Sequence, residues 1–178
     1  MTEREEMLSE EEIFDAYFMR IALNEARKAA EEGEVPAGCV IVDASSAFPS
    51  DPSSARILAV THNKTETLAN ATSHAEMLAI SEASQALGAW RLCNTRLYVT
   101  KEPCPMCAGA IILARIGSVV WGVSDPKRGG GTEFGIFSHK GINHHPEIVT
   151  GVLEDESKEV LVDFFRKRRE MKERSSEI

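Results

Sequence analysis

Two short segments constrain the fold of this chain more than any other part of its sequence. The first reads Ser-His-Ala-Glu at positions 73–76, and the second reads Pro-Cys-Pro-Met-Cys at positions 103–107. Together they supply one imidazole, two thiols and one further carboxylate. Each segment has the residues that typically begin a helix, a capping pattern in the first and a proline in the second. The fold must therefore bring two helix N-termini together around these side chains.

The side chains of the two segments form a donor set for zinc. Cys104 and Cys107 stand at positions i and i+3, which share one face of a helix, so both sulfur atoms reach one metal ion. With His74 they make three protein ligands, which leave the fourth tetrahedral position for water, as in catalytic zinc sites. Zinc lowers the pKa of such a water toward ~7 and so supplies a nucleophile at neutral pH. Glu76, close to a ligand but not itself one, is the candidate proton carrier.

Each part of this pattern also has an ordinary structural explanation. Ser73 and Glu76 fit a capping box, in which the glutamate only supports a helix start. His74 fits a plain histidine at a helix end, and the cysteine pair fits a structural zinc half-site or a redox pair. Because all the parts occur together, we interpret them as one catalytic zinc site, in which Glu76 serves as both cap and catalyst.

Composition predicts one globular domain over residues 1–178. No apolar run is long enough to span a membrane, and the acidic N-terminus does not resemble a signal peptide, so we expect a cytoplasmic protein. The net charge of −8 argues mildly against a general nucleic-acid binder. One basic run at 166–169 departs from this charge, and it fits either a solvated helix face or a phosphate grip. Cys39 and Cys93 are expected to be structural.

Periodicity predicts a layered α/β domain with helices covering both faces of the sheet. A capping box of Ser9 and Glu12 begins the first helix, and Gly33 ends it. We expect residues 1–10 to include a mobile N-terminus and residues 170–178 to be a frayed tail. Residues 43–54 are rich in Ser, Ala and Pro and predict a hairpin loop. The glycines at 129–131 fit a plain loop better than a phosphate cradle. The remaining predicted helices are 73–87, 105–114 and 154–172, the last with Val160, Leu161, Phe164 and Phe165 on one face, and the predicted strands are 39–42, 56–61, 97–100, 119–123 and 147–153.

These motifs resemble those of the cytidine-deaminase-like zinc superfamily, whose pattern is H-x-E…P-C-x-x-C. Within this superfamily the chain is similar to the bacterial tRNA-specific adenosine deaminases, which convert adenosine to inosine at the wobble position of an anticodon. The resemblance extends from about Phe18 to Glu170. Its segments are 34–38, Asn63, 74–76, 97–100, 102–110, 114–117, 143–148 and 163–169.

The resemblance implies a three-layer α/β/α fold, with a five-stranded mixed sheet between helices, and a homodimer with one zinc ion per subunit. It implies that His74, Cys104 and Cys107 bind zinc and that Glu76 carries protons. Asn63 would hydrogen-bond the target base, the backbone N–H of Ala75 would add a hydrogen bond, and Val35, Pro36 and Ala37 would wall the base pocket. Phosphates of a tRNA anticodon stem-loop are expected to meet Lys127, Arg128, Arg166 and Arg169.

The sequence leaves the substrate open. Residues 70–73 read Asn-Ala-Thr-Ser where the family usually has Asp-Pro-Thr-Ala, and the loop at 43–54 is longer than usual. A second hypothesis is therefore a deaminase of a free base or nucleotide (guanine, cytosine or dCMP) with the same zinc chemistry. A third hypothesis is a partner subunit without activity, which the intact Glu76 argues against. The sequence does not identify the tRNA or show whether DNA is accepted.

Overall fold

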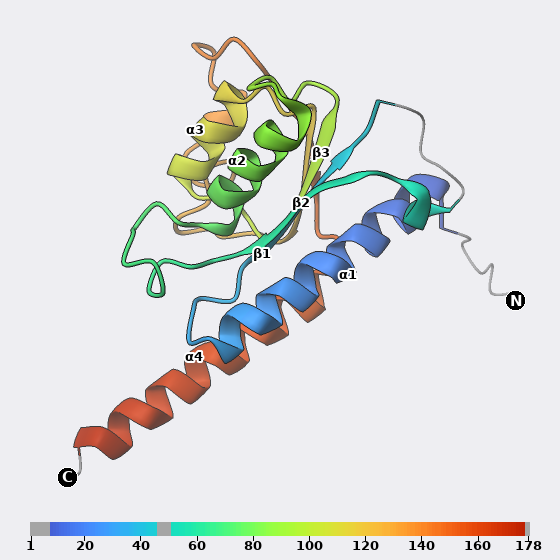
Figure 1. The fold of residues 1–178 in the computed structure, drawn as a ribbon. Helices are drawn as coiled ribbons and strands as arrows, with labels where there is room; N and C mark the ends of the chain where they lie inside the picture. Colours follow the sequence, from blue (N-terminus) through green and yellow to red (C-terminus); the bar gives the residue numbers. More distant parts are fainter. Residues whose placement is uncertain (1–7, 46–50, 177–178) are drawn as a thin grey trace, which may run out of the picture.

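The computed structural model of the chain describes residues 8–45 and 51–176. Five strands form one mixed sheet, as the sequence resemblance implied, and their order is β2-β1-β3-β4-β5. Figure 1 shows the whole domain. The second and third strands are each antiparallel to the first, whereas the third, fourth and fifth run parallel. The strands are Gly38–Asp43 (β1), Ile57–His62 (β2), Thr95–Lys101 (β3), Ser118–Val123 (β4) and Glu147–Thr150 (β5).

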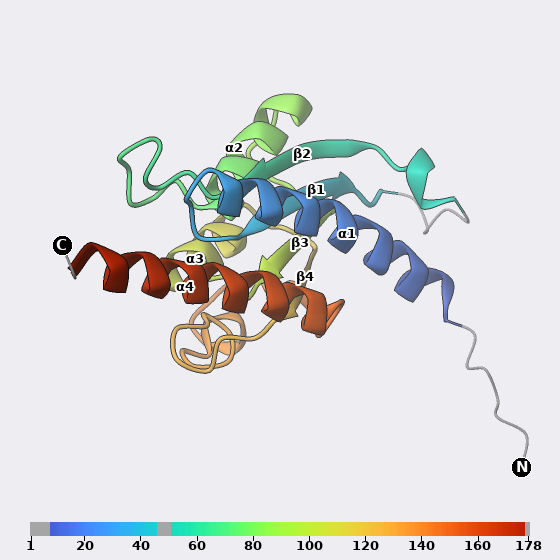
Figure 2. The same ribbon diagram turned by 90° about the horizontal axis from the view of Figure 1, so that it is seen from below.

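Two layers of helices cover the sheet, one on each face (Figures 1 and 2). Helices α1 (Glu10–Glu31) and α4 (Glu154–Ser176) lie side by side on one face, and α2 (Ala75–Leu87) and α3 (Pro105–Leu113) lie on the other. Alternate strand residues point to opposite faces, which gives the domain two apolar cores. Val40 and Tyr98 belong to the core beneath α1, while Ile41 and Val99 belong to the core beneath α2 and α3.

Helix α1 is fixed to the sheet by its cap, by close packing and by a buried ion pair. The predicted capping box is present, because Ser9 and Glu12 exchange hydrogen bonds at its first turn. Gly38 of β1 touches the helix so closely that an added Cβ would lie 1.9 Å from the carbonyl oxygen of Ala22. Only glycine fits there. Further along, the guanidinium of Arg96 donates two hydrogen bonds to the carboxylate of Asp15.

Most predicted elements lie within a few residues of their expected ends, with two differences. β5 ends at Thr150, because Gly151 and Leu153 adopt positive φ angles that turn the chain into α4. That helix extends through residues 170–176, which we expected to be a frayed tail, and ends at Ser176. In the predicted loop at 43–54, residues 52–54 form a short 3-10 helix, and residues 46–50 lie outside the described part. The expected mobile N-terminus lies outside it up to residue 7. Over the two ranges described, no helix has both the length and the apolar character of a membrane span.

Candidate active site

The predicted site residues converge on one edge of the sheet. Because β2 and β3 are both antiparallel to β1, their carboxyl ends lie at the same edge as the start of β1. β4 is parallel to β3 and ends at this edge too. Segment 34–37 enters the sheet here, and His74 and Cys104 each precede the helix that leaves it. The carboxyl ends of strands are the usual position of ligand sites in α/β sheets.

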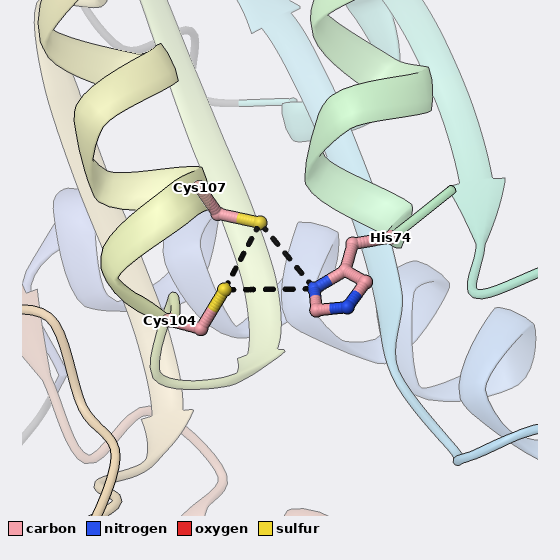
Figure 3. A group of neighbouring side chains, drawn as sticks. All are labelled: His74, Cys104 and Cys107. Carbon is pink, nitrogen blue, oxygen red and sulfur yellow. Dashed lines mark hydrogen bonds between the residues drawn. The ribbon is translucent and has the colours of Figure 1, made fainter. Parts of the chain in front are cut away.

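His74, Cys104 and Cys107 point toward one another between the starts of α2 and α3 (Figure 3). The two sulfur atoms are 3.6 Å apart, and Nδ1 of His74 lies 3.6 Å from Sγ of Cys104 and 3.5 Å from Sγ of Cys107. A tetrahedral zinc, with Zn–S of about 2.3 Å and Zn–N of about 2.0–2.1 Å, places its ligand atoms about 3.5–3.8 Å apart. The three protein atoms therefore fit three corners of a zinc tetrahedron, and among residues 8–45 and 51–176 no fourth His, Cys, Asp or Glu belongs to this group.

The positions of these side chains favour a thiolate at Cys104. His74 is the N-cap of α2 and Cys104 is the N-cap of α3, where the helix dipoles stabilise negative charge. The contact with the Cys107 sulfur lowers the pKa of Cys104 to about 3, and the same contact raises the pKa of Cys107. The hydrogen bond with Cys104 also raises the pKa of His74. A metal ion binds the deprotonated forms of these side chains, so metal binding would release the protons that they carry.

Glu76 lies beside this cluster as an uncoordinated carboxylate. Its side chain is not used as a cap, because α2 has His74 as its N-cap and no side-chain capping hydrogen bond. The predicted capping box of Ser73 and Glu76 is therefore wrong. Glu76 is only 4% exposed, and burial raises its pKa, which brings the carboxyl group closer to the range where a proton carrier works at neutral pH.

A cavity of about 520 Å³ adjoins the cluster, a volume typical of small-molecule sites. Asn63 in its wall is 5% exposed, and its amide nitrogen donates to the carboxylate of Glu34 and to the hydroxyl of Thr65. The cavity brings together most of the residues that the sequence nominated. Those in its lining are Val35, Ala37, Asn63, His74, Glu76, Cys104, Lys127 and Arg128.

Five nominated residues lie outside this lining, and one of them, Cys107, is buried in the ligand cluster beside it. Pro36 and Ala75 are buried beside it, and Arg166 donates to Asp163 on the same helix. Arg169 lines a second, smaller cavity of about 260 Å³ on α4. The other residues of that second cavity are Phe165, Arg168 and Lys172.

Phe165 belongs to the lining of both cavities, a position that the sequence did not predict. The helical pattern assigned it to the packed face of α4 with Phe164, but it is 41% exposed. It therefore connects the main cavity to the basic surface of α4. Sequence reasoning also missed Lys101 and Asp125, which form a 2.5 Å ion pair in the wall of the main cavity.

The glycine-rich loop after β4 is held by Glu102 and is not arranged to cradle a phosphate. The backbone N–H groups of Asp125, Gly131 and Thr132 donate to this carboxylate, as does the Thr132 hydroxyl. A Cβ added at Gly129 would lie 2.3 Å from a Glu102 oxygen. The loop needs glycine because the carboxylate occupies this space, and Glu102 itself is 2% exposed.

Comparison with known proteins agrees with this site. The MafB19-like deaminase family matches residues 14–169. The tRNA-specific adenosine deaminase of Bacillus subtilis is 46% identical over 159 residues, which cover 89% of this chain and 92% of that protein. A solved tRNA:A34 deaminase, studied for A-to-I editing at the wobble position, is 42% identical and covers 82% of this chain and 99% of its own, with a TM-score of 0.74. A solved guanine deaminase from Bacillus subtilis is 34% identical but covers 61% of this chain and 63% of its own, with a TM-score of 0.52.

A mixed five-stranded sheet with a His-Cys-Cys cluster and a free glutamate at the helix starts defines a deaminase of the cytidine-deaminase-like fold. The matches above extend over most of the chain and place it more narrowly. The chain belongs to the family of tRNA-specific adenosine deaminases.

Proposed function

We propose that this enzyme deaminates adenosine to inosine at the wobble position of a tRNA anticodon, with one zinc ion held by His74, Cys104 and Cys107. Zinc supplies an activated water as the nucleophile. In this reaction water adds to C6 of the base, the bond between C6 and the amino nitrogen breaks, and ammonia leaves. The observation that carries the proposal is the buried carboxylate of Glu76, beside the ligand cluster and inside the cavity.

The residues of this chain divide the remaining tasks. Glu76 takes a proton from the attacking water, passes it to a ring nitrogen and then protonates the departing amine. Asn63 and the N–H of Ala75 hydrogen-bond the target nucleoside, and the side chains of Val35 and Ala37 contact the base in the cavity wall. Because both apolar walls and the cluster are buried or half-buried, the flipped base is shielded from bulk water.

The outer part of the site supports a polymeric substrate. Lys127 and Arg128 line the main cavity, and Phe165 continues it into the second cavity, which Arg169 and Lys172 line. Exposed aromatic rings stack on the splayed bases of RNA loops, and cationic side chains contact the phosphates. A free base would need none of these outer groups.

The direct test is inosine formation by the zinc-loaded, full-length protein on an anticodon stem-loop with adenosine at the wobble position. A stem-loop with guanosine at that position is the matched control. We expect inosine only in the first RNA, detected by nuclease digestion and mass spectrometry. Failure to convert it, with zinc bound, would refute the proposal.

A second candidate is a deaminase of a free base or nucleotide, which the likeness to a guanine deaminase favours. The same protein is therefore assayed for ammonia release from guanine, cytosine, adenosine and dCMP. Ammonia from one of these together with an unmodified stem-loop would establish the second candidate. A homodimer and a cytoplasmic location stay predictions, of which light scattering at assay concentrations tests the first.

A further inference from the structure

Glu34 is a fully buried carboxylate that no part of the proposed chemistry uses. It follows α1 and is 0% exposed. Its oxygens accept hydrogen bonds from Nδ2 of Asn63 at 3.0 Å, from the Thr65 hydroxyl at 3.1 Å, and from the backbone N–H groups of Glu66 at 3.2 Å and Thr67 at 2.7 Å. All four donors are neutral. A buried charge held in this way is expensive to keep, so its contacts merit a functional explanation.

The carboxylate dictates the orientation of the Asn63 amide. Burial raises the pKa of Glu34, but the N–H groups of Thr67 and Glu66 outweigh burial and hold the pKa below its ordinary value. An ionised carboxylate only accepts hydrogen bonds, so the amide of Asn63 must turn its NH₂ group toward Glu34. The Thr65 hydroxyl gives its own proton to Glu34 and accepts the second N–H of Asn63 at 3.0 Å. Both N–H bonds of Asn63 are thereby used, and Oδ1 is left for a ligand.

We propose that Glu34 is a positioning residue, which holds Asn63 in the single amide orientation that offers Oδ1 to a hydrogen-bond donor of the target nucleoside. Asn63 lies in the cavity wall, and the rotation of its amide would exchange an acceptor for a donor at that point. Thr65 lies in the same wall, so Glu34 fixes two lining residues at once. The inference rests on the proposed function only through the contact between Asn63 and the substrate.

A double-mutant cycle of Glu34→Gln and Asn63→Ala tests the coupling. A glutamine at position 34 either donates or accepts, so it no longer selects one orientation of the Asn63 amide. In the otherwise natural protein we expect Glu34→Gln to lower kcat/KM on the stem-loop roughly tenfold, within the range of coupled neighbours. In the Asn63→Ala background the same change should alter kcat/KM by less than about twofold, because the amide that Glu34 orients is gone.

Glu102→Gln is the matched control. Glu102 is also buried and also accepts from four neutral donors, but these donors lie in the loop at 125–132, and none of them belongs to Asn63. The fold-reductions in kcat/KM caused by Glu102→Gln and by Asn63→Ala should multiply in the variant that carries both changes. The inference is overturned if the fold-reductions in kcat/KM caused by Glu34→Gln and by Asn63→Ala also multiply in full. It is overturned as well if Glu34→Gln alone leaves kcat/KM unchanged.

A second measurement needs no substrate and uses neither variant of the cycle. In the ¹⁵N-labelled protein, the side-chain amide protons of Asn63 should exchange slowly with water, and they should exchange faster in Thr65→Val, which removes the acceptor of one N–H. Equal exchange rates in the natural protein and in Thr65→Val would contradict the clamp. If the stem-loop is not a substrate but a free base is, the proposed function fails while the cycle, repeated with that base, still decides the inference.

Discussion

At the scale of single residues, the division of labour between His74 and Glu76 decides whether the site is catalytic. Both lie at the start of α2, but His74 takes the N-cap position, and Glu76 is left without a capping role. Burial beside the His74, Cys104 and Cys107 cluster raises its pKa. A structural zinc site would have no use for such a group, because all four positions would be closed by protein.

We therefore expect Glu76→Gln to abolish turnover and to leave metal binding intact. The glutamine keeps the shape of the side chain but does not carry protons, and general acid–base groups typically contribute 10²–10⁴-fold to rate. Steady-state rates on the stem-loop and zinc content by elemental analysis check the two halves of this expectation. Cys107→Ser is the contrasting variant and should lose most of its zinc. Retained turnover in Glu76→Gln would mean that another group moves the protons.

The convergence of the three candidate ligand residues was predictable from the sequence, because residue type and local spacing indicate it. His74, Cys104 and Cys107 needed only helix geometry and the chemistry of zinc. Glu34 and Glu102 could not be recognised in the same way, since their partners lie far away in the sequence and include backbone N–H groups. No side-chain pattern encodes such partners.

At the scale of secondary-structure elements, the buried pair of Arg96 and Asp15 connects α1 to the centre of the sheet. Arg96 is 1% exposed and Asp15 is 3% exposed, and the hydroxyl of Tyr98 donates to the same carboxylate at 2.8 Å. Removal of one partner from a buried pair leaves an uncompensated charge, which usually costs about 3–5 kcal/mol. Helix α1 also precedes segment 34–37, so its position sets one wall of the cavity.

Arg96 keeps its ion pairs with Glu11 and Glu147 when Asp15 is removed. Asp15→Ala should therefore lower the free energy of unfolding by less than for an isolated buried pair, about 1.5–3 kcal/mol. Urea denaturation followed by circular dichroism measures this loss. Asp163→Ala, which breaks the exposed pair with Arg166 on α4, removes the same charge from a helix and should change stability by about 0.5 kcal/mol or less. Equal losses in the two variants would show that burial of the pair contributes nothing.

The strand that carries Arg96 illustrates what the sequence hides at this scale. The apolar run from Leu97 predicted β3, but a charged residue just before such a run suggests a strand end in water. Burial of Arg96 is tolerable because residues far away in the sequence supply its partners, Asp15 from α1 and Glu147 from β5. The caps of α1 and α3 were predictable because Ser9 and Pro105 act on their own helix turns.

At the scale of the whole molecule, paired and hydrogen-bonded carboxylates make the fold sensitive to acid. Burial raises the pKa of Glu34 and of Asp125, but hydrogen bonds lower each pKa by more than burial raises it. The donors to Glu34 include backbone N–H groups, and those to Asp125 are Lys101 and backbone N–H groups. A folded-state pKa below the unfolded value means that the unfolded chain binds more protons between the two, so stability rises with pH there. The contribution is complete above the unfolded pKa of about 4.3 for glutamate and is lost as pH falls through the folded value.

We expect the melting temperature to change little between pH 7 and pH 5 and to fall steeply below about pH 4.5. Glu34→Gln should have a lower melting temperature at pH 7, and its further fall on acidification should be smaller than in the natural protein. Differential scanning fluorimetry across this range measures both effects. An acid-induced fall of the same size in Glu34→Gln would assign the sensitivity to other carboxylates.

The distribution of charge over the molecule determines how an acidic protein binds RNA. The net charge of −8 repels a polyanion at long range, whereas Arg169 and Lys172 gather beside Phe165 where α4 meets the cavity mouth.

If these two residues neutralise phosphates, the combined Arg169→Gln and Lys172→Gln variant should reduce the slope of log KM against log salt concentration by roughly 1–2, since each contact contributes about 0.7–0.9. Lys158→Gln is the matched control. Lys158 lies on the first turns of the same helix, outside both cavities, so its replacement should leave the slope unchanged. Because zinc binding and Glu76 are untouched, kcat at saturating stem-loop should stay within about twofold in both variants. Parallel salt slopes for the natural protein and the double variant would place the phosphate contacts elsewhere, with Lys127 and Arg128 as the next residues to test.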